Sequence, residues 1–153
     1  MRISFDLDGV IADTDRWFFR MLNAMQSHKI IIDMLDIMEL DYYSSRPLKF
    51  HPDYFMTSDD VGIIITSRRP LAIEVTKAWL DNNHILIPAI FSDRNGDIDW
   101  ADYRDASLIA GARKANIIKV HNIEVHFDNN PYIVDTIRKE APSTKVILVG
   151  GRR

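Results

Sequence analysis

Five short apolar runs alternate with helical patterns along this chain, and no other feature limits its possible folds as strongly. The runs cover residues 3–7, 61–66, 89–91, 124–127 and 145–149. One amphipathic helix is predicted from Pro70 to Asn82, and another from Pro131, after a capping Asn130, to a stop before Pro142. Strands that alternate with helices are typical of a parallel sheet with helices on both faces. We therefore expect an α/β fold with a three-layer, Rossmann-like parallel sheet.

Residues 13–59 break this alternation. They are rich in aromatic residues and methionine, and they predict one helix around residues 17–25 and another over 30–40, with no strand of comparable quality. We interpret this segment as a small helical cap inserted after the first strand. Residues 1–12 and 60–153 then form the core domain.

The composition excludes several classes of protein. A length of 153 residues with 46% apolar residues suits one domain with a modest insertion. The net charge of −3, with both signs mixed along the chain, predicts neither duplex nucleic acid nor a membrane surface as a partner. The chain has no cysteine, which excludes disulfides and thiolate catalysis. Because it lacks a signal-peptide pattern and an apolar run near the ~18 residues of a membrane helix, we expect a cytoplasmic protein, with its oligomeric state left open.

Two carboxylates end the first predicted strand. Asp6 and Asp8 lie two residues apart, and residues i and i+2 of an extended strand share a face. Both can therefore point into the crevice at the carboxyl ends of the strands, where open α/β sheets bind ligands. Gly9 then permits a sharp turn or the close approach of a ligand to the backbone. Paired acids in this position indicate phosphoryl chemistry.

Further polar residues reach the same predicted edge. Thr66 and Ser67 end the second strand, Asp128 ends the fourth, and Lys114 precedes the fourth strand at the start of a predicted helix. Three carboxylates, a hydroxyl and a lysine at one sheet edge are costly unless ions bind them. A magnesium ion and a phosphate together would satisfy every member of the set.

These residues resemble the four motifs of the haloacid dehalogenase superfamily of phosphohydrolases. The matching positions occur in the family's order and at its strand ends: 6–10, Thr66, Lys114 and 128–129. The resemblance spans nearly the whole chain and implies that superfamily's core with a small cap. The insertion after the first motif, the run 66–70 and the segment 126–131 most resemble the 5′(3′)-deoxyribonucleotidase-like branch.

The resemblance implies a catalytic role for each motif residue. Asp6 would attack phosphorus and form an aspartyl phosphate, while Asp8 would protonate the leaving oxygen and then deprotonate water. Thr66 would bind a phosphoryl oxygen, and Lys114 would offset negative charge on Asp6 and on the transferring group. Lys119 is an alternative to Lys114, but it lies about 140° away around a helix, so that only one of the two can face the site.

The resemblance also implies a magnesium ion as cofactor. Its ligands would be Asp6, the main-chain carbonyl of Asp8, and Asp128. Many relatives carry two adjacent acids in the fourth motif, whereas this chain has Asn129 after Asp128. We expect weaker metal affinity from the loss of that charge.

Substrate contacts are expected from the loop after the second strand and from the cap. The main-chain amide near Ser67 would bind a phosphoryl oxygen, and Arg68 or Arg69 suits a substrate phosphate. Tyr42 and Tyr43 are candidates for stacking on a nucleobase, although such residues also form the core of a cap. Phe18 and Phe19 are further candidates for stacking, and Arg46 and Lys49 are candidates for contacts with the sugar or phosphate.

We therefore expect a magnesium-dependent phosphomonoester hydrolase whose partner is a small phosphorylated substrate, most simply a (deoxy)nucleoside monophosphate. A polynucleotide 3′-phosphatase or another small-molecule phosphatase is possible on the same core. The alternative from a different class is a catalytically weak module that binds phosphate or metal. The five histidines are dispersed without ligand spacing, and we interpret them as structural or surface residues.

Overall fold

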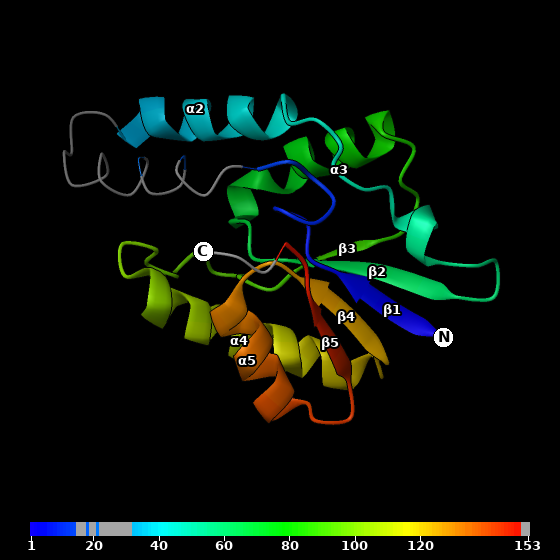
Figure 1. Ribbon diagram of the computed structural model, residues 1–153. Coiled ribbons are helices and arrows are strands. Elements are labelled where there is room, and N and C mark those ends of the chain that lie inside the picture. The colour runs from blue at the N-terminus through cyan, green and yellow to red at the C-terminus, as the bar shows by residue number, and fades with distance from the viewer. Residues whose placement is uncertain (15–17, 19–20, 22–31, 151–153) are drawn as a thin grey trace.

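The computed structural model describes residues 1–14, 18, 21 and 32–150, and its centre is a five-stranded parallel sheet (Figure 1). The strand order is β3-β2-β1-β4-β5. The strands are β1 (Arg2–Phe5), β2 (Val61–Thr66), β3 (Ala89–Phe91), β4 (Val125–Asp128) and β5 (Lys145–Leu148). Helices flank both faces, which confirms the predicted α/β, three-layer, Rossmann-like fold.

The strands lie where the apolar runs predicted them, with shifts of one or two residues at some ends. The largest shift is in β1, which ends at Phe5 although the run continues to Leu7. The carbonyl of Leu7 accepts the N–H groups of Ile11 and Ala12, so the chain already turns there. Gly9 adopts a φ of +82° in this turn, a conformation that glycine adopts without steric cost.

The helices of the core are α3 (Ile73–Asn82), α4 (Tyr103–Val120) and α5 (Pro131–Glu140). A short 3-10 turn, η3 (Pro70–Ala72), precedes α3. The side chain of Asn130 caps α5 as predicted, since it accepts from the N–H groups of Tyr132 and Ile133. The prediction that Lys114 starts a helix is wrong. Helix α4 begins eleven residues earlier, because Asp102 caps it by accepting from the Asp105 N–H.

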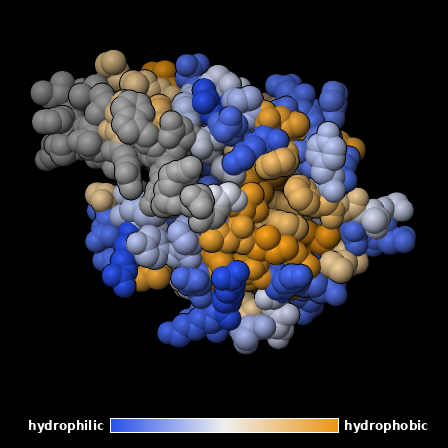
Figure 2. Space-filling model, in the orientation of Figure 1, coloured by the Kyte–Doolittle hydropathy of each residue, from blue (hydrophilic) through white to orange (hydrophobic). Residues whose placement is uncertain are grey.

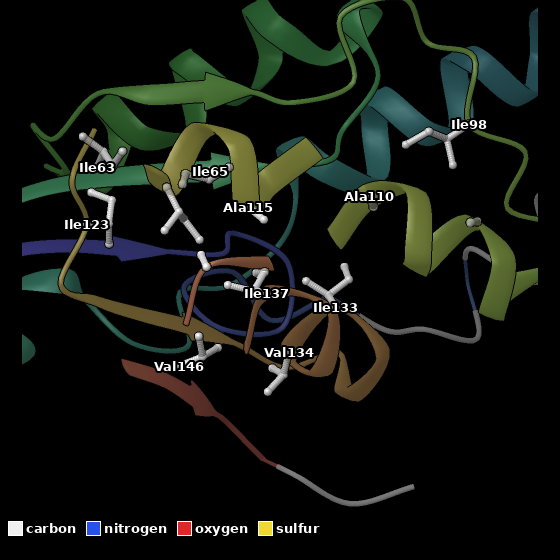
Figure 3. Packing of buried hydrophobic residues seen from close by; sticks show 13 residues of the cluster. Ile63, Ile65, Ile98, Ala110, Ala115, Ile123, Ile133, Val134, Ile137 and Val146 are labelled. Carbon is white, nitrogen blue, oxygen red and sulfur yellow. The ribbon is translucent and has the colours of Figure 1, made fainter. Parts of the chain in front are cut away.

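Helices α4 and α5 cover one face of the sheet. Figure 3 shows the packing between them and the strands, where branched aliphatic side chains of β2, β5 and α5 meet small residues of α4. Gly111 of α4 makes this packing close. A Cβ at that position would lie 2.8 Å from the Cβ of Thr136 on α5.

Helix α3 covers part of the opposite face, where Trp79 and Leu80 pack over β1 and β2. Beyond α3, the 3-10 helix η2 (Pro52–Phe55) places Phe55 against Phe5 and Phe127, with ring centroids 6.0 and 5.1 Å away. Figure 2 shows apolar side chains gathered on the surface where Figure 1 shows β4 and β5. Within the described residues, no helix combines the length and the hydropathy that crossing a bilayer requires.

The inserted segment contributes α2 (Ile32–Ser44), which lies beside α3 (Figure 1). It covers most of the helix predicted over residues 30–40 and continues four residues further. The helix predicted around residues 17–25 lies largely outside the described residues. The indole N–H of Trp79 donates to the Arg46 carbonyl at 2.7 Å, and this bond joins the segment that follows α2 to α3.

The order of the strands determines where a ligand can bind. From β1 the chain adds β2 and β3 on one side and then returns to add β4 and β5 on the other. The loops that follow β1 and β4 therefore diverge, and this is the position at which open α/β sheets bind ligands. Asp6 follows β1 directly and Asp128 ends β4, so that both carboxylates lie at this position.

Candidate active site

Lys114 joins the two carboxylates at the ends of β1 and β4. Its Nζ lies 2.8 Å from Asp6 Oδ1 and 2.8 Å from Asp128 Oδ2. Lys114 is 1% exposed and Asp128 is fully buried, so solvent screens neither pair. Lys119, the alternative lysine, is exposed on α4. The structure therefore brings Asp6, Lys114 and Asp128 together and leaves Lys119 at the surface.

Two buried side chains, His126 and Ser4, extend the hydrogen-bond network from Asp128 into the sheet. His126 Nε2 lies 3.2 Å from Asp128 Oδ2, and His126 Nδ1 lies 2.7 Å from Ser4 Oγ. Burial is the main cause of a lowered His126 pKa, which keeps the imidazole neutral at pH 7. Because a carboxylate only accepts, the Nε2–H of His126 donates to Asp128 and its Nδ1 accepts from the Ser4 hydroxyl. This arrangement fixes the orientation of the Asp128 carboxylate.

The two carboxylates that share Lys114 differ in protonation. Burial, with the charges of Asp128 and Asp8, raises the pKa of Asp6 to about 8, and Lys114 offsets only part of that rise. Burial also opposes the charge on Asp128, but Lys114 and His126 outweigh it and hold its pKa below the ordinary value. The pKa of Lys114 is raised, because its two carboxylate partners outweigh the effect of burial. Asp128 is therefore the carboxylate that Lys114 stabilises more strongly in the ionised form, while the surroundings of Asp6 disfavour its negative charge.

Asp8 lies in a different environment, because the guanidinium of Arg68 binds it. Arg68 Nε lies 3.0 Å from Asp8 Oδ2, and Arg68 Nη2 lies 2.7 Å from Asp8 Oδ1, which is a bidentate pair. Arg68 is 3% exposed, and its Nη1 donates to Thr76 Oγ1 at 2.9 Å. The predicted phosphate-binding arginine is thus held by Asp8 and Thr76, and its role toward a substrate stays a prediction.

The environment of Asp6 and Asp8 also suits a hard cation. The side-chain amide of Asn129, oriented to satisfy its neighbours, places its nitrogen 3.0 Å from the Asp8 carbonyl and 3.2 Å from Asp6 Oδ2. These two oxygens therefore converge on one point, where the Asn129 amide donates a hydrogen bond to each of them. They are two of the three ligands predicted for magnesium.

The third predicted ligand is Asp128, and its carboxylate retains acceptor capacity. It accepts from Lys114, His126 and the main-chain N–H of Asn130, whereas a carboxylate offers about four acceptor positions. Two carboxylates and a carbonyl are the oxygen ligands that magnesium prefers, so the residues fit this ion. The described residues contain no cluster of three or more acidic or histidine side chains arranged around a metal. A site here would therefore depend on the main-chain carbonyl of Asp8.

Gly9 is needed beside this point for steric reasons as well as for its φ. A Cβ at Gly9 would lie 1.9 Å from the terminal amide atom of Asn129. Any other residue would displace that amide. Lys49 also approaches this turn, with its Nζ donating to the Gly9 carbonyl at 3.1 Å.

The remaining predicted phosphate ligands lie at the end of β2. Thr66 is fully buried, and its Oγ1 accepts from the N–H of Arg68 at 3.2 Å. Ser67 is half-buried, and its Oγ lies 3.4 Å from Ser92 Oγ. Both residues therefore lie on the same edge as Asp6, because β2 is the neighbour of β1 in the sheet.

The predicted base-stacking tyrosines contact other protein groups. Tyr43 is 2% exposed, with the Arg68 guanidinium carbon 3.8 Å from its ring centroid and its hydroxyl donating to Glu39 at 3.1 Å. Tyr42 stacks on Phe18, with centroids 3.7 Å apart, and the Arg46 guanidinium lies 4.0 Å from its ring centroid. Phe19, another candidate, lies outside the described residues.

Arg69, the second candidate for a phosphate contact, turns toward α2. Its Nη2 donates to Asp36 at 3.0 Å and also to Glu39, both of which lie on α2. The two arginines after β2 therefore divide their contacts. Arg68 binds a candidate catalytic carboxylate, and Arg69 binds the insertion.

Sequence reasoning missed three residues that organise the site: His126, Thr76 and Asn130 in its role beside Asp128. His126 precedes Asp128 by two positions on one strand, so the period of two predicts a shared face. The sequence therefore contains a signal for this contact, which the interpretation of the histidines as structural or surface residues does not use. No comparable signal joins Thr76 to Arg68, because their contact depends on how α3 docks.

Comparison with solved structures identifies a fold neighbour. A chain of the Pnkp1/Rnl/Hen1 RNA repair complex superposes with a TM-score of 0.60 at 16% sequence identity. The match covers 97% of this chain and 42% of that one, so this chain spans less than half the neighbour's length. At this identity the likeness shows the fold alone. No family model matches the sequence, and no curated protein matches it either.

Proposed function

We propose that this chain is a magnesium-dependent phosphomonoester hydrolase of the haloacid dehalogenase type, with Asp6 as the nucleophile. The observation that carries the proposal is the point on which Asp6 Oδ2 and the Asp8 carbonyl converge, beside the Lys114 ammonium. Asp6 is flanked by the buried Lys114 ammonium and by oxygens that would hold a cation. This arrangement suits attack on a phosphate, since the ammonium and the bound cation would both stabilise the negative charge that develops there. Thr66 and Ser67 lie at the adjacent strand end.

The chemistry divides into two displacements. In the first, a carboxylate oxygen of Asp6 bonds to phosphorus, the bond from phosphorus to the leaving oxygen breaks, and Asp8 gives that oxygen a proton. For this step Asp8 must enter in its protonated form, with one of its oxygens released from the Arg68 pair. In the second, Asp8 takes a proton from water, the resulting hydroxide bonds to phosphorus, and the aspartyl ester bond breaks. Inorganic phosphate leaves, and Asp6 and Asp8 return to their starting forms. Lys114 stays positively charged throughout and offsets the charge of Asp6 and of the phosphoryl group.

Asp6, Asp128 and the Asp8 carbonyl would hold the magnesium ion. When bound, the ion neutralises Asp6 and polarises a phosphoryl oxygen. The raised pKa of Asp6 supports this assignment, because burial and the charges of Asp128 and Asp8 disfavour the ionised form, and a bound cation would offset them. For binding, the Asn129 amide must move away from Asp6 Oδ2, which gives a physical reason for the weaker metal affinity expected from this residue.

The substrate class that we propose is a nucleoside or deoxynucleoside monophosphate. A second candidate is the 3′-phosphate of a polynucleotide, and the fold neighbour from an RNA repair complex favours it. Both candidates use the same catalytic residues and differ only in what surrounds the phosphate. The remaining alternative is a module that binds phosphate or metal without turnover.

Phosphate release tests the proposal directly. The panel contains nucleoside 5′- and 3′-monophosphates, ribose 5-phosphate, a 3′-phosphorylated oligonucleotide and an aryl phosphate, each with magnesium or with a chelator. We expect wild-type turnover only with magnesium, and its loss in Asp6→Asn. Full magnesium-dependent activity of Asp6→Asn would exclude the covalent mechanism. A folded protein that binds magnesium but releases no phosphate from any substrate would favour the binding module.

A further inference from the structure

Three aromatic side chains gather where α4 and α5 begin, and we call them the aromatic cluster: Trp100, Tyr103 and Tyr132. The ring centroids of Trp100 and Tyr103 are 6.1 Å apart, as are those of Tyr103 and Tyr132. Tyr132 is 37% exposed, and the other two side chains are half-buried. The cluster therefore combines rings that hold one another in place with aromatic surface that a ligand can reach.

A chain of hydrogen bonds ties this cluster to the candidate active site. The main-chain N–H of Asn130 donates to Asp128 Oδ1 at 3.0 Å, and Asn130 Oδ1 accepts from the N–H of Tyr132 at 3.0 Å. Asn130 Nδ2 donates to Ser107 Oγ at 2.9 Å, and that hydroxyl donates to the Tyr103 carbonyl at 2.6 Å. Asn130 is 7% exposed, so water competes little for these bonds. The positions of Tyr103 and Tyr132 are thus fixed relative to Asp128.

The cluster belongs to the helices on the face of the sheet opposite α2. Helix α2 lies above the sheet in Figure 1, while α4 and α5 lie below it, and α5 begins near the carboxyl ends of the strands. Tyr43 of α2 is buried against Arg68, and Tyr42 is stacked on Phe18. Tyr132, whose main chain is joined to Asp128 through Asn130, presents exposed aromatic surface on this side.

We infer that the aromatic cluster binds the nucleobase of the nucleotide whose phosphate lies at Asp6. The inference rests on the proposed function and assigns the base to the start of α5 rather than to the cap. Stacking on an aromatic ring suits every base, because each base has a flat π face. A nucleotide has the required form, since its charged phosphate and its flat base are joined by a short sugar.

The charges around the cluster favour a base over a longer polyanion. Asp99, Asp102 and Asp105 are exposed beside it, and Arg104 is the exposed basic residue among them. A neutral base tolerates these carboxylates, whereas the phosphates of an extended strand are repelled by them. The cluster therefore suits the single nucleotide that bears the reacting phosphate, either free or at the end of a polynucleotide.

Tyr132→Leu tests the inference, because it keeps apolar volume and removes the π face. Tyr132→Phe keeps the ring, and Tyr54→Leu is the matched control, since Tyr54 is 81% exposed on η2. The measurement is kcat/KM for a nucleoside monophosphate relative to that for ribose 5-phosphate, which has no base. We expect Tyr132→Leu to lower this ratio about 5- to 100-fold, mainly through KM, as one lost stacking contact predicts. Tyr132→Phe and Tyr54→Leu should keep the wild-type ratio.

Two results would overturn the inference. An unchanged ratio in Tyr132→Leu would show that the ring does not contact the base. An equal loss with ribose 5-phosphate would show that Tyr132 only supports α5 and Asp128.

A 3′-phosphorylated oligonucleotide distinguishes the two sources of the base. A fall in the ratio with the mononucleotide alone supports a free nucleotide, and a fall with both substrates supports a terminal nucleotide as well.

Calorimetric binding separates this inference from the proposed function. Nucleoside monophosphate is titrated into Asp6→Asn and into Asp6→Asn with Tyr132→Leu, neither of which requires turnover. Weaker binding in the double variant supports the base site even if no phosphate is ever released. Equal binding in both variants overturns the base site even if the wild-type protein is an active phosphatase.

Discussion

Asp6 and Asp8 lie two residues apart in the sequence, yet the molecule surrounds them with different partners. The Asp6 side chain is 10% exposed and bonds to the Lys114 ammonium, which also bonds to Asp128. The Asp8 side chain is 21% exposed and is bound by the Arg68 guanidinium. Asp6 shares the compact ammonium of Lys114 with Asp128, whereas Asp8 alone is bound by the bidentate guanidinium of Arg68.

The comparison shows that the two carboxylates depend on different parts of the chain. The partners of Asp6 come from α4 and β4, which belong to the core. Arg68, the partner of Asp8, packs against the ring of Tyr43 on α2. The hydroxyl of Tyr43 bonds to Glu39, which in turn pairs with Arg69. The position of Asp6 is thus a property of the sheet, while the environment of Asp8 also depends on α2.

Removing Lys114 should have the largest effect, because two carboxylates would lose their shared cation. We expect Lys114→Met to lower the free energy of unfolding by about 3–5 kcal/mol, the usual cost of leaving a buried charge without its partner. Lys119→Met is the matched control, since Lys119 is exposed on the same helix, and it should change stability by less than about 0.5 kcal/mol. Chemical denaturation measures both variants. Similar stabilities would show that the Lys114 pairs contribute little.

Breaking the Asp8 pair should cost less, because Asp8 retains contact with water. Arg68→Met removes the three hydrogen bonds to Asp8 and the bond to Thr76, and we expect it to lower the free energy of unfolding by about 2–3 kcal/mol. Arg68→Lys keeps the charge but loses the bidentate geometry, so it should recover only part of this stability. Arg104→Met, at an exposed arginine, is the control. Full recovery by lysine would mean that charge alone, without the fork geometry, holds Asp8.

The Asp6 half of the site was more predictable from sequence than the Asp8 half, for a physical reason. Carboxyl ends of parallel strands meet at one edge, so strand assignments alone bring Asp6, Thr66 and Asp128 together, and helix α4 returns Lys114 to them. The contact between Asp8 and Arg68 depends instead on how the loop after β2, which carries Arg68, packs against α2. No periodicity encodes that docking, because α2 and β2 are separate elements whose contact is set by tertiary packing.

The raised pKa of Asp6 gives the next prediction, which concerns pH. Folding raises this pKa from near 4 to about 8, so the folded state binds more protons than the unfolded state between these values, and stability falls as pH rises through that window. Asn at this position cannot ionise. We therefore expect Asp6→Asn to gain stability relative to wild type as the pH is raised from 5 to 8, by no more than about 1.4 kcal/mol per pH unit. Thermal unfolding of both proteins in chelator, across this range, measures the difference, and a constant gap would show that Asp6 is ionised throughout.

Magnesium should reduce this difference, because it favours the ionised form of Asp6. We expect the wild-type protein to gain thermal stability with added magnesium at pH 7 and to release protons as the ion binds. Calorimetry in buffers of different ionisation enthalpy counts those protons. Asp6→Asn should show neither effect. Equal stabilisation of the two proteins would place the ion away from Asp6.

The smallest expected effect isolates the link between the Asp8 half of the site and the cap. Burial raises the pKa of the Tyr43 phenol, with further contributions from Asp8 and Glu39, so the hydroxyl stays protonated and donates to Glu39 at 3.1 Å. Tyr43→Phe removes this bond but keeps the ring under Arg68, and should cost about 1 kcal/mol. Tyr43→Leu also removes the cation–π contact and should cost more, whereas Tyr54→Phe, at an exposed tyrosine, should change nothing measurable. If Arg68→Met abolishes the difference between Tyr43→Phe and Tyr43→Leu, the ring of Tyr43 acts through Arg68, and the cap contributes to how Asp8 is held. If the difference persists, Tyr43 stabilises α2 alone, and the core by itself determines the environments of both Asp6 and Asp8.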